Sequence, residues 1–267
     1  MRDIKMRDTI LNVSRSSADP VEVVMEESGL PQGFKKNIDD FVGSLRKLYF
    51  DDLVCVILYG SAVSGELTEA HSNINLLVVL KKTDLSSLEV SRRLVNQPSN
   101  RRIEPLFLSR EHILSSSDVF PIEFLDMKDD HVCLYGSDVL KEVQIDPRNL
   151  RFQCEQELKS KLILVKQQYL RVNPKDKRAL ANLLFRNLTS VAHILRNLLR
   201  LKGKIPSRKK EDLFKEIAAE LQVETVVFLK IWQAKKYPAR LSARDLKALL
   251  GGFVLELDKI IKAVDRL

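Results

Sequence analysis

The chain begins with alternating apolar runs and amphipathic stretches, a pattern that predicts a sheet with helices around it. Two runs, Val54–Tyr59 and Ile74–Leu80, are continuously apolar and rich in β-branched residues. Such runs are typical of strands that are covered on both faces. Apolar residues at helical spacing over 34–50 and 85–95 predict two amphipathic helices.

Residues 102–108 predict a third strand, and Pro105 predicts either an edge position or an interrupted ladder, because proline donates no ladder hydrogen bond. Ser109 reads as the cap of a following helix. Residues 119–134 contain an apolar strand-like piece, a charged turn at 128–130 and another short strand. The tripeptide Tyr135-Gly136-Ser137 repeats that of residues 59–61 and predicts a turn and helix cap.

From Leu150 onward the pattern is helical nearly throughout, with leucine-rich stripes that predict the core of a bundle. The expected helices span 149–172, 176–201, 209–221, 224–236 and 243–265. The predicted fold class is α+β: a mixed β-sheet domain with flanking helices, followed by an all-α helical bundle. The predicted domains are a polar N-terminal arm (1–32), the sheet domain (33–146) and a basic helical bundle (147–267).

Charge is divided unevenly along the 267 residues, whose formal net charge is +8. Residues 1–150 hold 18 Lys+Arg against 24 Asp+Glu, a net −6, whereas residues 151–267 hold 26 against 12, a net +14. The basic half predicts a nucleic acid or an acidic protein as partner, or else a solvated lysine-rich surface. Aromatic residues are few and are not interleaved with the basic ones, so no base-stacking platform is expected.

The sequence shows no membrane-length apolar run and no signal-peptide core near its start, so a cytoplasmic protein without a membrane partner is expected. The cysteines Cys55, Cys133 and Cys154 fit neither a metal clip nor a disulfide framework. The oligomeric state is not encoded in any recognisable pattern.

Gly60-Ser61 closes the first apolar strand, and after eleven residues Asn73-Ile74-Asn75 opens the second. This arrangement resembles the signature of the nucleotidyltransferase superfamily, which includes polymerase β-like, antibiotic-modifying and minimal nucleotidyltransferases. The resemblance implies that Gly60 and Ser61 hold a nucleoside triphosphate through backbone N–H groups and the serine hydroxyl. It also implies carboxylates at positions 73 and 75, where they would hold Mg²⁺ ions.

Asparagine at both positions departs from that pattern, and Mg²⁺ depends on carboxylates and substrate phosphates because it gives up its water reluctantly. Our leading hypothesis is therefore a catalytically degenerate protein that keeps nucleotide or phosphate binding at the Gly60-Ser61 turn. The alternative is an active enzyme that transfers a nucleoside monophosphate to a hydroxyl acceptor. Its Mg²⁺ would be held by Glu66, Glu69 or Glu104, of which Glu104 also occupies the strand expected to supply a third carboxylate.

A further alternative rests on Arg186 and His193, which lie seven residues apart on one predicted helix. The pair, with Asn187 after the arginine, is similar to the Arg-x4–6-His motif of HEPN domains, helical bundles that often cleave RNA. In such a site Arg186 would stabilise phosphate charge and His193 would handle a proton. An antitoxin or scaffold role for the bundle is also open. The structural alternative is an exposed Arg186 and a partly buried His193.

Overall fold

A computed structural model describes residues 32–64, 73–207, 209–236 and 241–267 of the chain. The described residues fall into two compact units. Unit 1 contains those up to Ser115 together with Asp126–Val143, and unit 2 contains Ser116–Leu125 and Gln144–Leu267. The predicted polar arm lies outside the described residues except for Gln32, which begins the first described helix.

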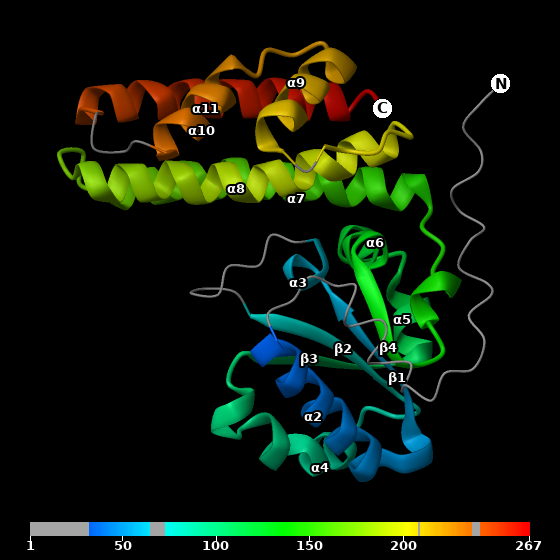
Figure 1. Cartoon of the computed structure of the whole chain (residues 1–267). Coiled ribbons are helices and arrows are strands. Elements are labelled where there is room, and N and C mark those ends of the chain that lie inside the picture. The colour runs from blue at the N-terminus through cyan, green and yellow to red at the C-terminus, as the bar shows by residue number, and fades with distance from the viewer. Residues whose placement is uncertain (1–31, 65–72, 208, 237–240) are drawn as a thin grey trace. The chain divides into compact units, whose positions relative to one another are not determined.

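The core of unit 1 is a four-stranded sheet with the strand order β3-β2-β1-β4 (Figure 1). Strand β1 (Leu53–Tyr59) is antiparallel to both β2 (Ile74–Leu80) and β4 (His131–Gly136). Strand β3 (Ile103–Ser109) is parallel to β2. The sheet is therefore mixed, and β3 is an edge strand, one of the two arrangements that Pro105 predicts.

Both faces of the two central strands are buried, as their continuous apolar sequences predict. Helices α2 (Gln32–Tyr49) and α4 (Leu85–Val95) lie on one face, where apolar residues of α2 form a core cluster with alternate strand residues (Figure 1). That cluster includes Ile38, Phe41, Leu45, Val56, Leu58, Leu76 and Val78. The strand residues of opposite parity, Cys55, Ile57, Leu77 and Val79, are also fully buried.

The connections of unit 1 contain two shorter helices, α3 (Ser61–Ser64) and α5 (Arg110–Ser116). The Ser109 hydroxyl accepts a hydrogen bond of 3.0 Å from the N–H of His112, which confirms the predicted cap. After the second Tyr-Gly-Ser, the side chain of Asp138, rather than that of Ser137, caps the short 3₁₀ helix η3 (Val139–Glu142).

The strand-like piece expected near residue 119 is wrong: the segment forms helix α6 (Pro121–Asp129). Ile122, Phe124 and Met127 are buried. The alternation of Ile122 and Phe124 resembles a strand over a few residues, but Pro121 is the better signal. Proline suits the first position of a helix, where its missing N–H costs nothing.

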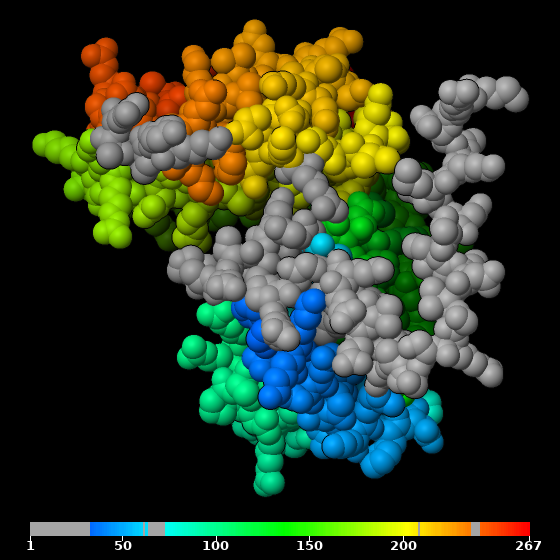
Figure 2. Space-filling view, viewed as in Figure 1, coloured from blue at the N-terminus to red at the C-terminus, as the bar shows by residue number. Residues whose placement is uncertain are grey.

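Unit 2 is a bundle of long helices whose ends lie within two residues of the predicted positions. The helices are α7 (Pro147–Arg171), α8 (Lys177–Leu201), α9 (Lys210–Leu221), α10 (Val226–Lys236) and α11 (Ala243–Val264). Their leucine stripes form one apolar cluster. Within it, the ring centroid of Phe228 lies 5.6 Å from that of Phe214 and 5.4 Å from that of Phe253. In the space-filling view the side chains of α9 and α10 form a continuous surface over the bundle (Figure 2).

None of the helices in the described part of the chain combines the length and the apolar composition needed to cross a bilayer.

Glycine is required at position 136, at the end of β4, both by its backbone conformation and by its close neighbours. Its φ is +76°, and a Cβ added there would stand 2.0 Å from the carbonyl oxygen of Val54. Gly203 has a similar φ of +70° but nothing within 4 Å of an added Cβ. The two glycines therefore separate the cost of a left-handed backbone from the cost of a steric clash.

Gly203→Ala should lower the free energy of unfolding by about 1 kcal/mol, the cost of placing a Cβ in the left-handed region. Gly136→Ala should lower the free energy of unfolding several times as much, because the backbone at Val54 cannot move away from the new Cβ without breaking the β1–β4 ladder. Urea denaturation of both variants measures the difference. Equal losses would contradict the close approach of β4 to β1.

Candidate nucleotide site

The turn after β1 is held by backbone hydrogen bonds. Gly60 has a φ of +77°, a conformation that favours glycine. Its N–H donates to the carbonyl of Asp130 at 3.0 Å, and its carbonyl accepts from the N–H of Val63 at 2.9 Å. The N–H and the carbonyl of Gly60 are therefore both used within the protein.

Strand register gathers residues that are far apart in the sequence. Asn75 of β2 pairs with Tyr59 of β1 on one side and with Glu104 of β3 on the other. Asn73, just before β2, uses its amide Nδ2 to donate a hydrogen bond to Oε1 of Glu104. Both Asn73 and Glu104 are exposed. The polar side chains at the start of β2 and β3 are thus directly connected.

The side chain of Asn75 lies against the glycine turn. A Cβ added to Gly60 would stand 3.3 Å from Nδ2 of Asn75. Glycine at this position therefore leaves room for the amide as well as permitting the turn. The structure consequently brings Gly60, Asn73, Asn75 and Glu104 into one cluster at one end of three neighbouring strands.

This cluster does not fit the pair of Mg²⁺ ions that the resemblance implies. Glu104 is its one carboxylate, and the nitrogen by which Asn73 faces Glu104 is a hydrogen-bond donor, not a metal ligand. Within the described ranges, no group of three His, Cys, Asp or Glu residues is arranged to hold a metal ion. The predicted alternatives Glu66 and Glu69 lie outside the described residues.

Tyr59, which pairs with Asn75, interacts electrostatically with Glu104 of the cluster. Burial raises the pKa of the Tyr59 phenol above its usual value of 10.0, and the negative charge of Glu104 raises this pKa further. The phenol therefore stays neutral at physiological pH and presents a hydroxyl, not a phenolate, beside the carboxylate.

His131 is a feature of this sheet that no sequence motif signals. It pairs with Tyr59 across β1 and β4. Its ring Nδ1 is 2.9 Å from the carbonyl oxygen of Lys128, and its Nε2 is 3.0 Å from Oδ2 of Asp138. Both ring nitrogens thus have partners in the protein. Through them, His131 links the start of β4 to Asp138, the residue that caps η3.

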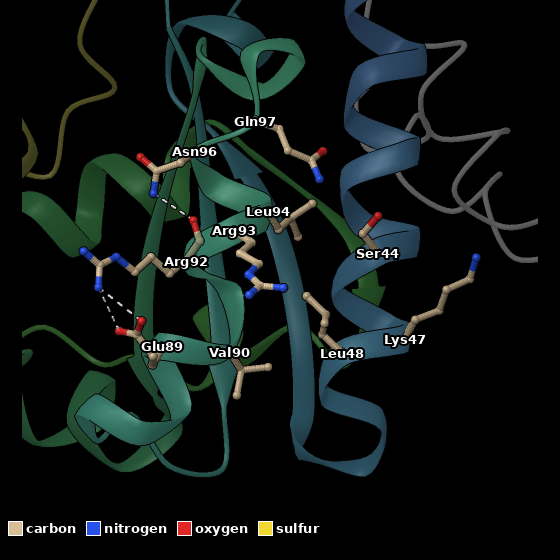
Figure 3. A pocket seen from close by; sticks show the side chains of 10 residues that line it. All are labelled: Ser44, Lys47, Leu48, Glu89, Val90, Arg92, Arg93, Leu94, Asn96 and Gln97. Atoms are coloured by element: carbon tan, nitrogen blue, oxygen red, sulfur yellow. Dashed lines mark hydrogen bonds and ion pairs between the residues drawn. The ribbon is translucent and has the colours of Figure 1, made fainter.

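A large hollow of unit 1 lies away from this cluster, between α2 and α4 (Figure 3). Its volume is about 1080 Å³. Leu48 of α2 and Arg93 of α4 extend into the space between the helices, while Lys47 points away from α4 and Arg92 turns aside to pair with Glu89 at 3.1 Å (Figure 3). None of the predicted site residues lines this hollow.

The bundle residues of the HEPN-like alternative lie on α8. Arg186 and His193 are both exposed, so the expectation of a partly buried His193 is wrong. Asn187, next to Arg186, is buried and donates to the carbonyl of Leu183 at 2.7 Å and to Oε1 of Gln168 at 3.1 Å. Asn187 therefore helps to hold α7 against α8. Its side chain is buried between the helices, unlike the exposed side chains of Arg186 and His193.

No protein-family model and no curated protein matches the chain. Among solved structures, the chain is similar to the spectinomycin adenyltransferase AAD(9) from Enterococcus faecialis, solved with ATP and spectinomycin. The two share 15% identity over 84% of this chain and 98% of that one, with a TM-score of 0.52. The chain has the nucleotidyltransferase fold. A nucleotidyltransferase-like protein from Exiguobacterium sibiricum 255-15 also aligns, at 13% identity over 86% of this chain and 77% of that one, with a TM-score of 0.36.

The similarity to the adenyltransferase structure confirms the predicted fold class, a mixed sheet with flanking helices followed by a helical region. At 15% identity it shows the fold alone. The chemistry has to be argued from the residues of this chain.

Glu104→Gln should lower the pKa of Tyr59, because it removes the negative charge that opposes ionisation of the phenol. The fall should be partial, since burial is the larger cause. A pH titration of tyrosinate absorbance, with Tyr59→Phe to identify the signal, measures it. Glu89→Gln on α4 is the control, and a Tyr59 pKa that responds equally to both substitutions would contradict the cluster.

Proposed function

We propose that this chain is a catalytically degenerate nucleotidyltransferase-fold protein that binds a nucleotide, or another phosphate ligand, beside the Gly60-Ser61 turn. The observation that carries the proposal is the contact of Asn75 with the glycine turn, together with the register that sets Asn75 beside Glu104. The amides occupy the place where the resemblance implies metal-binding carboxylates.

The exchange of carboxylate for amide changes what the site does to a phosphate. Two carboxylates beside a triphosphate repel it unless a divalent ion lies between them. An asparagine removes that repulsion, and its N–H₂ group can donate a hydrogen bond to a phosphate oxygen. With Asn73 and Asn75, Glu104 is the one described carboxylate left in the cluster, so binding has less need of Mg²⁺, although the site loses the ion that would polarise the reacting phosphate.

The active-enzyme alternative retains Glu104 as its one described carboxylate. A single carboxylate can help to hold one Mg²⁺ when substrate phosphates supply further oxygens. In this structure, however, Glu104 accepts a hydrogen bond from Asn73. A metal that binds both oxygens of Glu104 would have to compete with that amide, whereas a metal that binds Oε2 alone would leave Asn73 in place.

Restoring both acids should make nucleotide binding dependent on Mg²⁺. In the double variant Asn73→Asp/Asn75→Asp, ATP affinity in EDTA should fall about tenfold or more below that of the unmodified protein, because three carboxylates then repel the phosphates. Addition of Mg²⁺ should restore it. Adding Glu104→Gln to the double variant should weaken that restoration. Calorimetric titration of ATP measures all three effects.

The matched control is Asn37→Asp, the same change on the exposed surface of α2, which should leave ATP binding unchanged in either condition. Equal loss in Asn37→Asp and Asn75→Asp would contradict a local effect. If the unmodified protein releases pyrophosphate from a nucleoside triphosphate and Glu104→Gln abolishes the release, the active-enzyme alternative replaces the proposal.

A further inference from the structure

Two adjoining hollows on unit 2 share the exposed face of α8. One, of about 390 Å³, lies between α7 and α8 and is lined by Lys161, Arg171 and Arg186 among others. The other, of about 570 Å³, is lined by Arg186, by Thr189 and by Lys235 of α10. Asn182, Arg186 and Ser190 line both hollows, and no acidic residue among the described ones lines either. Arg186 therefore stands in the middle of a groove in which cations and neutral polar groups border an apolar floor that includes Leu164 and Phe185.

Among the described residues, some cations elsewhere on the bundle are paired with carboxylates, whereas those lining the groove are not. Several lie 2.5 to 3.2 Å from a carboxylate oxygen, namely Arg151, Lys159, Lys204, Lys215, Lys259 and Lys262. Within the described ranges, by contrast, Lys161, Arg171 and Arg186 have no carboxylate partner. Helix α8 itself contains five Lys and Arg residues and no Asp or Glu. The groove thus keeps the positive charge of the cations that line it.

Lys235 is held in place at the end of the groove. Its Nζ donates to Oγ1 of Thr189 at 3.2 Å, and Thr189 in turn donates to the carbonyl of Phe185 at 3.0 Å. The same ammonium lies 5.5 Å from the ring centroid of Trp232, with Lys210 at 4.9 Å from that ring. Burial lowers the pKa of Lys235, and the nearby positive charge of Lys210 lowers it further.

We propose that this groove binds a chain of linked phosphate groups, as in the backbone of single-stranded nucleic acid or in a free polyphosphate. Arg171, Arg186 and Lys235 succeed one another along it and would contact successive phosphates, while Asn182 and Ser190 add neutral hydrogen-bonding groups. Guanidinium groups suit this role because their paired N–H donors match phosphate oxygens. The groove belongs to unit 2 alone and is independent of the nucleotide site proposed on unit 1.

The test is fluorescence anisotropy of a labelled oligouridylate with the full chain in EDTA at low ionic strength. Arg186→Gln should weaken binding roughly five- to tenfold, the effect of losing one charge-assisted contact. It should also reduce the slope of log affinity against log salt by about 0.7, the value for one single-strand phosphate contact. Lys235→Gln should act in the same direction.

Two matched controls lie on the same helices outside the groove, both exposed: Arg178→Gln on α8 and Lys230→Gln on α10. Each should change affinity no more than about twofold, the loss expected from general screening of charge. Melting temperatures of all four variants should equal that of the unmodified protein, since the replaced side chains are exposed.

Competition by inorganic tripolyphosphate distinguishes the two sources of phosphate. Tighter binding of the oligouridylate indicates a nucleic-acid strand, and tighter binding of tripolyphosphate indicates a free polyphosphate; both support the site. The proposal is overturned if neither probe binds, or if Arg178→Gln costs as much as Arg186→Gln. The variant Asn73→Asp/Asn75→Asp should bind the oligouridylate normally, so failure of this proposal and failure of the nucleotide proposal are separable.

Discussion

Two ladders fix strand β2, one antiparallel to β1 and one parallel to β3, and every feature of the candidate site depends on their register. A slip of one residue would turn Asn75 to the opposite face of the sheet and take it out of line with Glu104. The residues that follow Asn75 in β2 are fully buried on both faces, so such a slip would also disrupt the close packing on each face. The same packing therefore fixes Glu104 beside Asn75 and brings the amide of Asn75 against Gly60.

The distribution of charge follows a consistent physical logic. The cluster on the sheet has two amides where the resemblance implies acids, so it no longer concentrates the negative charge that divalent ions require. The groove around Arg186 is lined by cations that have no carboxylate partner among the described residues. Under both proposals, phosphate oxygens would be bound without a metal ion between protein and ligand. The acidic first half of the sequence would thus bind phosphate through amide groups, and the basic second half would bind it through cationic side chains.

Most of the fold could be predicted from the sequence because its signals are local. Apolar runs located the central strands, Pro105 indicated an edge strand or an interrupted ladder, and leucine stripes located the helices of the bundle. Helix α6 was missed since Ile122 and Phe124 alternate like strand residues over a short span. The contacts within the site could be predicted only in part: the motif identified Gly60 and Asn75, but the hydrogen bond from Asn73 to Glu104 depends on strand register, which no local pattern contains.

The most direct test of the central claim is calorimetric titration of the unmodified protein with ATP and with GTP, first with Mg²⁺ and then with EDTA. A site that has exchanged carboxylates for amides should bind a nucleotide with nearly the same affinity in both conditions. Binding that appears only with Mg²⁺ would mean that other ligands replace the lost acids, and absence of binding in both would mean that the turn at Gly60 is not a nucleotide site. Either result would contradict the account.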